Sequence, residues 1–130
     1  MPDARLRKEE RLKSRKQLNA LFAGGRSIRV FPIRFFSMTI EDDSQYPVRV
    51  AFGVSRRLWK RAVDRNLLKR RMREAYRLQK HLVYASVLPA GRQLLLSCMY
   101  TADMICSFEQ IKSAMGKGLE RLAAQIAQPQ

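Results

Sequence analysis

The sequence has few of the residues on which small enzymes and secreted domains usually depend. Its 130 residues include one histidine, two cysteines and 11 acidic residues. A protein nuclease without a cofactor commonly needs an acid and a base, often a histidine pair or a histidine with a carboxylate. Asp42 and Asp43 fall in a predicted turn and Asp64, Asp103 and Glu109 are dispersed, so no carboxylate cluster indicates a magnesium site. We therefore expect no catalytic residue and no metal ligand in this chain.

The cysteines and the apolar runs are equally sparse. Cys98 and Cys106 form no CxxC motif and no cluster with histidine, so the sequence indicates neither a disulfide framework nor a zinc site. No apolar run is long enough to span a bilayer, and residues 1–10 are charged where a signal peptide would be apolar. We expect a reduced, cytoplasmic protein without a membrane segment.

Positive charge is what the sequence has in excess. Lysine and arginine number 26, and the formal net charge is +15, beside a hydrophobic content of 46%. A chain of this length can bury one small core, and a charge of this size attracts polyanions. We expect one domain with nucleic acid as its leading partner and an anionic membrane as the second. Charge alone does not distinguish RNA from DNA.

The N-terminal part of the chain predicts a basic arm followed by a helix. Residues 1–13 are polar and charged, which predicts a mobile basic N-terminal arm. Ser14 and Gln17 have the spacing of a capping box, and apolar residues follow at helical spacing. Gly24 and Gly25 then predict a helix end that uses positive φ. Residues 14–130 are predicted to form one α+β domain, which would be the part of the chain that binds nucleic acid.

The rest of the chain alternates strand and helix patterns. Residues 33–40 and 48–54 have strand patterns around a polar turn, which predicts a hairpin. Residues 62–83 predict the longest helix, residues 93–100 a buried third strand, and residues 107–127 a final helix despite two glycines. The order α-β-β-α-β-α predicts an α+β fold with one small sheet.

The basic residues are concentrated in residues 56–77, where only Asp64 and Glu74 oppose them. A helical wheel places Leu68, Ala75, Leu78 and Leu82 on the apolar face. The opposite face has no acid and is rich in arginine, which is well suited to binding phosphate. The simpler alternative is a charged helix face that is exposed to solvent and binds no partner. Arg71 falls on the apolar side, so we expect it to snorkel or to pair with Asp64 or Glu74. The cationic face consists of Arg65, Asn66, Lys69, Arg70, Arg73, Arg77 and Lys80.

The sequence KRAVDRNLLKRRMREAYR, at residues 60–77, resembles the signature helix of the bacterial ribonuclease P protein component. Arg11-Leu12-Lys13, Gly25 and the strand end VAFGVSRR also fall in the family order. The resemblance implies a left-handed βαβ crossover and a role in maturing the 5′ end of transfer RNA precursors. In that family the RNA subunit and its Mg²⁺ perform the hydrolysis, and the protein is the accessory subunit.

The resemblance also implies partners and sites. The partners would be the ribonuclease P RNA subunit and precursor tRNA, with the protein itself monomeric and holding no cofactor alone. The signature has Leu67 where the family usually has a second arginine, so this position cannot bind a phosphate. A cleft for the precursor's 5′ leader, between the first helix and the sheet, would include Leu18, Phe22 and Phe36. Without the resemblance, ordinary core packing would be the favoured interpretation of the two phenylalanines. The predicted RNA-binding residues are Lys60, Arg61, Arg65, Asn66, Lys69, Arg70, Arg73 and Arg77.

Two other functions remain open from the sequence. A structural RNA-binding protein, of ribosomal or assembly type, could use the same helix without a role in cleavage. A DNA-binding protein could place the helix in a major groove, although the sequence has no recognisable helix-turn-helix. Trp59, just before the signature, could either anchor its loop in the core or stack on RNA.

Overall fold

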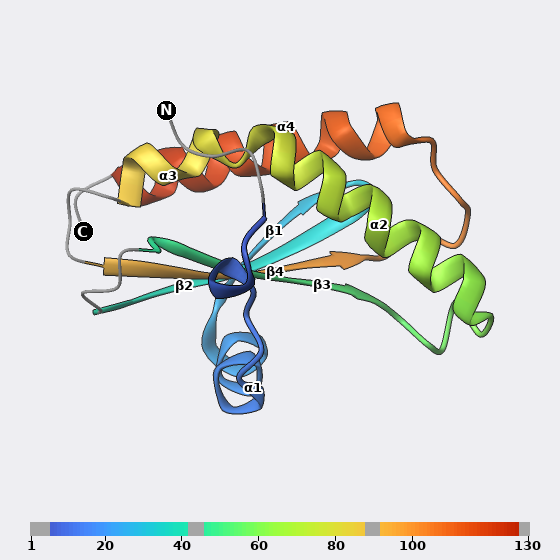
Figure 1. The fold of residues 1–130 in the computed structure, drawn as a ribbon, viewed down its shortest axis with the longest axis horizontal. Coiled ribbons are helices and arrows are strands. Elements are labelled where there is room, and N and C mark those ends of the chain that lie inside the picture. Colours follow the sequence, from blue (N-terminus) through green and yellow to red (C-terminus); the bar gives the residue numbers. More distant parts are fainter. Residues whose placement is uncertain (1–5, 42–45, 88–91, 128–130) are drawn as a thin grey trace.

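The computed structural model describes residues 6–41, 46–87 and 92–127, and it confirms an α+β fold (Figure 1). One mixed sheet of four strands has α1 on one side and α2, α3 and α4 on the other (Figure 1). The elements are η1 (Lys8–Glu10), α1 (Arg15–Gly24), β1 (Arg26–Val30), β2 (Ile33–Glu41), β3 (Val48–Val54), α2 (Ala62–Gln79), α3 (His81–Val87), β4 (Arg92–Tyr100) and α4 (Phe108–Ala127).

The strand order is β1-β2-β4-β3, which corrects the predicted hairpin between β2 and β3. β4 lies between these strands, antiparallel to β2 and parallel to β3. Almost all side chains of β4 are buried, as they are in a strand that is covered on both faces. The polar residues between β2 and β3 in the sequence do not indicate that another strand lies between these two. The connection from β3 through α2 and α3 to the parallel β4 is a βαβ crossover.

The strand β1 was not predicted. It pairs with β2 in an antiparallel hairpin across Phe31 and Pro32, which are joined by a cis peptide bond. Its sequence, RSIRV, is short and mostly polar, and only Ile28 is buried. A short edge strand of this kind has little of the apolar and polar alternation by which a strand is detected in a sequence.

Two helix predictions also need correction. The helix predicted over residues 62–83 ends at Gln79, α3 follows after Lys80, and α4, with 20 residues, is longer than α2, with 18. Ser14 does cap α1, because its Oγ accepts a hydrogen bond from the Gln17 N–H at 3.2 Å. Gly25, however, has a φ of −76°, not a positive value. Glycine is required there because a Cβ would lie 2.5 Å from the Leu21 carbonyl oxygen.

The core occupies both faces of the sheet unequally. The larger cluster lies between the sheet and the three helices α2, α3 and α4, and it includes Phe35, Leu68 and Cys98. The smaller cluster lies under α1 and centres on Leu12, Leu21 and Leu95. α4 approaches β2 so closely that a Cβ on Gly118 would lie 2.2 Å from the Phe35 ring.

Both cysteines are buried free thiols. Burial raises the pKa of the Cys98 thiol well above its ordinary value. No helix in the described part of the chain has the length and apolar character that crossing a membrane requires.

Candidate nucleic-acid interface

The cationic side of α2 is exposed because its opposite side is fixed in the core. Leu68, Met72 and Tyr76 are fully buried. The backbone periodicity of the helix then directs Arg70 and Arg73 outward, and both are exposed. Neither has an ion-pair partner among the residues that the structure describes. Asn66 is exposed beside them and Lys69 is half-buried.

Arg65 is held at the start of α2 by backbone carbonyls. Its guanidinium donates hydrogen bonds to the carbonyl oxygens of Trp59 at 2.7 Å and of Lys60 at 2.8 Å. The Trp59 indole in turn donates to the Ala102 carbonyl at 2.9 Å and contacts Tyr100 edge to face. Trp59 is therefore a structural anchor of the loop, and Lys60 and Arg61 are exposed beside it.

The C-terminal end of the predicted cationic face differs from the wheel. Arg77 forms an ion pair with Glu74 at 2.5 Å, so this end is not free of acids. The Arg77 hydrogen bond lowers the pKa of Glu74. Lys80 is 4% exposed, with its Nζ 2.8 Å from Glu10, and so leaves the face altogether. Leu78, which the wheel placed on the apolar side, is 40% exposed.

Arg71 and Leu67 lie on the flank of α2. Arg71 is half-buried, as a snorkelling side chain would be, but its guanidinium donates to the Cys106 carbonyl at 2.6 Å instead of pairing with Asp64 or Glu74. Leu67 is also half-buried. The cations that remain exposed on or just before α2 are Arg56, Arg57, Lys60, Arg61, Arg70 and Arg73.

A second surface lies between α1 and the sheet. Phe22 is 45% exposed, and its ring meets the half-buried Phe36 ring edge to face, with centroids 5.0 Å apart. The Arg34 guanidinium lies over the Phe36 ring at 4.9 Å and is oriented by a hydrogen bond from its Nε to Ser27. Leu18 is half-buried in the smaller cluster. Phe36 and Leu18 thus combine a packing role with partial exposure.

A groove of about 530 Å³ continues this surface along α1, between Ser14, Lys16 and the strands. Arg49 lines the groove, and its Nε is buried without a hydrogen-bond partner among the described residues. Sequence reasoning did not select Arg34 or Arg49. The sequence did contain a signal for both arginines. Each alternates with core residues along its strand, so its side chain must lie on the face of the sheet that carries α1.

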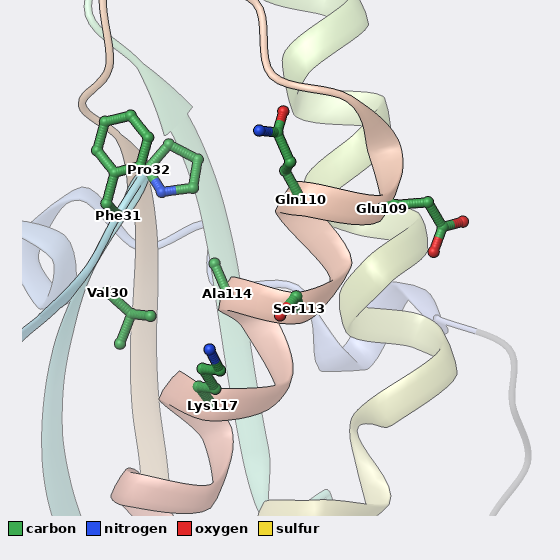
Figure 2. Close-up of a pocket in the computed structure, with 8 residues that line it drawn as sticks. All are labelled: Val30, Phe31, Pro32, Glu109, Gln110, Ser113, Ala114 and Lys117. Atoms are coloured by element: carbon green, nitrogen blue, oxygen red, sulfur yellow. The ribbon is translucent and has the colours of Figure 1, made fainter.

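A hollow of about 390 Å³ lies elsewhere, between α4 and the turn from β1 to β2 (Figure 2). Phe31 and Pro32 face α4 across it, and Phe31 is 63% exposed. Glu109 and Lys117 balance each other in charge, so this hollow does not extend the cationic surface. Among the described residues, no group of three or more histidine, cysteine or acidic side chains could hold a metal ion.

The fold and the α2 face define a small basic α+β protein with an exposed cationic helix and an aromatic surface behind its sheet. The chain matches the family model described as Ribonuclease P over residues 6–123. It is 33% identical over 122 residues to the ribonuclease P protein component of Porphyromonas gingivalis, covering 93% of this chain and 88% of that protein. The chain belongs to the ribonuclease P protein family.

Other relatives agree with this assignment. The ribonuclease P protein component of Chlorobaculum tepidum is 38% identical over 119 residues, which cover 85% of this chain and 77% of that protein. Solved structures share the fold at low identity. The ribonuclease P protein of Thermotoga maritima has a TM-score of 0.69 at 20% identity, covering 86% of this chain and 96% of that one. The ribonuclease P protein of Staphylococcus aureus has a TM-score of 0.62 at 18% identity, covering 92% of this chain and 98% of that one.

Proposed function

We propose that this chain is the protein subunit of a cytoplasmic ribonuclease P, which removes the 5′ leader from precursor tRNA. The catalytic RNA and its Mg²⁺ supply the hydrolysis, and the monomeric protein supplies binding surfaces. The observation that carries the proposal is a pair of exposed arginines on α2, Arg70 and Arg73, in a chain of the ribonuclease P protein family, and neither forms an ion pair with any residue that the structure describes. The names of its relatives, each a ribonuclease P protein component, support the same role.

The α2 face is the proposed contact with the RNA subunit. Cations that bind phosphates release condensed counterions, and arginine offers phosphate a planar fork of donors. Arg65 acts differently from the exposed arginines, because its hydrogen bonds to Trp59 and Lys60 hold the loop before α2. The proposed RNA-binding residues are Lys60, Arg61, Arg65, Asn66, Lys69, Arg70, Arg73 and Arg77, the last already paired with Glu74.

The surface behind the sheet is the proposed site for the leader. An unpaired strand needs aromatic rings on which bases stack and cations that follow its backbone. Phe22 and Phe36 supply exposed ring surface, Leu18 supplies apolar contact, and Arg34 lies beside the rings. Arg49 adds a buried donor without a partner among the described residues, which suits an anionic oxygen in the groove.

Cleavage of precursor tRNA at low magnesium tests the proposed function. A bacterial ribonuclease P RNA is assayed alone and with the protein, on a precursor that has a 5′ leader. The protein is expected to accelerate cleavage, because its cations replace part of the screening that magnesium provides. RNA binding without any gain in cleavage would instead identify a structural RNA-binding protein, and a preference for duplex DNA would identify a DNA-binding one.

Replacing Phe36 by alanine is expected to slow cleavage of a precursor with a leader. Removal of one stacking platform costs about 1 to 3 kcal/mol, so kcat/KM should fall by about five- to a hundredfold. Binding of mature tRNA, which lacks the leader, should be unchanged. The matched control is Phe31→Ala, which removes a ring that is 63% exposed beside α4, away from the α1 surface. Equal losses with and without a leader would contradict the assignment.

A further inference from the structure

The segment before α1 is attached to the edge of the sheet. The Leu12 N–H donates to the Val50 carbonyl at 2.8 Å, and Arg11 forms a parallel bridge with Val50. Leu12 is buried in the smaller cluster. The backbone of this segment therefore extends the sheet beyond β3, and the alternation of a strand leaves Arg11 and Lys13 exposed on either side of Leu12.

A buried carboxylate fixes the same segment from its other end. Glu10 is 3% exposed, and its Oε1 accepts hydrogen bonds from Lys80 Nζ at 2.8 Å and from the Tyr84 hydroxyl. Its Oε2 accepts from the Arg7 N–H at 2.6 Å. Burial by itself would raise the pKa of Glu10, but these hydrogen bonds outweigh burial and hold the pKa below its ordinary value. Glu10 is therefore ionised, and its hydrogen bonds attach the N-terminal segment to the junction of α2 and α3.

This attachment places cations from two distant parts of the chain around one hollow. A hollow of about 180 Å³ is lined by Arg11 and Lys13 from the N-terminal segment and by Arg73 from α2. Val50 and Phe52 of β3 also line it. The described residues that line it include no acid, although Glu9 and Glu10 are close in sequence. Like charges that converge in this way repel one another unless an anion lies between them.

We infer that Arg11, Lys13 and Arg73 together bind one phosphate of an RNA backbone, and that Glu10 is the residue that positions the first two. The inference rests on the proposed function for the identity of the anion as RNA. Arg73 belongs to the α2 face, and Lys13 directly precedes Ser14, which lines the groove along α1. The site thus joins the two surfaces proposed for the RNA subunit and the leader.

A purely structural role for Glu10 is the competing explanation. A buried ion pair is weak evidence for stability, because the cost of removing both charges from water can exceed their attraction. If the ion pair of Glu10 only kept the N-terminal segment on the edge of β3, its removal would change the stability of the fold and would not change the salt dependence of RNA binding. If it positions cations, its removal also abolishes their contribution to binding. The salt dependence of RNA affinity separates these cases.

Four single variants test the inference: Arg11→Gln, Lys13→Gln, Glu10→Gln and Glu9→Gln. Affinity for an in vitro transcribed bacterial ribonuclease P RNA is measured across a salt series. One phosphate contributes about 0.7 to 0.9 to the slope of log K against log salt, and Arg11→Gln and Lys13→Gln should each remove part of that contribution. Neither side chain is in the core, so folding is retained. An unchanged slope in both would overturn the phosphate site.

Glu10→Gln and Glu9→Gln change the net charge equally, and Glu9 is exposed. Removal of an acid should strengthen binding of a polyanion, and this is the expected result for Glu9→Gln. Glu10→Gln should weaken binding and flatten the slope, and adding Arg11→Gln to it should have little further effect. Equal behaviour of the two glutamate variants would overturn the positioning role. Wild-type protein without salt-dependent RNA binding would instead refute the proposed function itself.

Discussion

Replacing Arg61, Arg70 and Arg73 together by glutamine is expected to weaken binding of a ribonuclease P RNA by about a hundredfold at physiological salt. All three side chains are exposed, and none has an ion-pair partner among the described residues. Each arginine that no longer binds a phosphate should flatten the slope of log K against log salt by about 0.7 to 0.9, so the triple variant should have a slope flatter by about two to three units. A filter-binding or fluorescence titration across a salt series measures both quantities.

The matched control removes three positive charges that lie on other elements. Arg26, Lys117 and Arg121 are exposed, the first on β1 and the other two on α4. Their triple replacement by glutamine gives the same change in net charge. If affinity depended only on net charge, the two triple variants would bind alike, and the α2 face would have no special role. A selective decrease in the first variant, with unchanged thermal unfolding, assigns the RNA contact to α2.

Replacing Phe35 by alanine is expected to destabilise the fold by about 3 to 5 kcal/mol. The ring is completely buried between β2 and α4, and Gly118 packs directly upon it. Such a decrease is a large part of the total stability of a domain, which is typically about 5 to 15 kcal/mol. Urea unfolding followed by circular dichroism measures the change. If Phe35→Ala destabilised the fold no more than the substitution of a solvent-exposed residue does, α4 would not pack against the Phe35 ring.

Gly118 provides the complementary test of the same contact. A methyl group there would overlap the Phe35 ring, so Gly118→Ala should cost about 1 to 3 kcal/mol. In the Phe35→Ala background the added methyl has room, and its cost should disappear, which a double-mutant cycle detects. Gly24→Ala is the control, because a Cβ there meets no atom within 4 Å. That substitution should be neutral or slightly stabilising.

Local patterns in the sequence predicted most of the elements but not their pairing. The cap at Ser14, the alternation in β3 and the amphipathic pattern of α2 depend on residues within a few positions of one another, and the structure has all three. Strand order depends on contacts between distant residues. The position of β4 between β2 and β3 therefore contradicts the hairpin that the polar residues between them in the sequence predict.

The predicted cationic face of the helix was wrong at one end for the same reason. The wheel placed Lys80 with the cations because it considered only the helix, whereas the partner of Lys80 is Glu10, 70 positions earlier in the chain. Glu74 was counted as an opposing acid, but its pairing with Arg77 depends on rotamers that a wheel does not contain. The exposed centre of the face, around Arg70 and Arg73, follows from the buried side of α2 alone.

The burial of both native thiols has a practical use. Cys98 has a fully buried side chain and Cys106 is almost as inaccessible, so maleimide reagents should react with neither in the folded protein. A cysteine introduced at an exposed position such as Glu9 or Arg121 would then be the preferred point of attachment for a fluorophore or a cleavage reagent. Tethered probes of this kind would map which nucleotides approach each side of the protein, without first removing the natural cysteines.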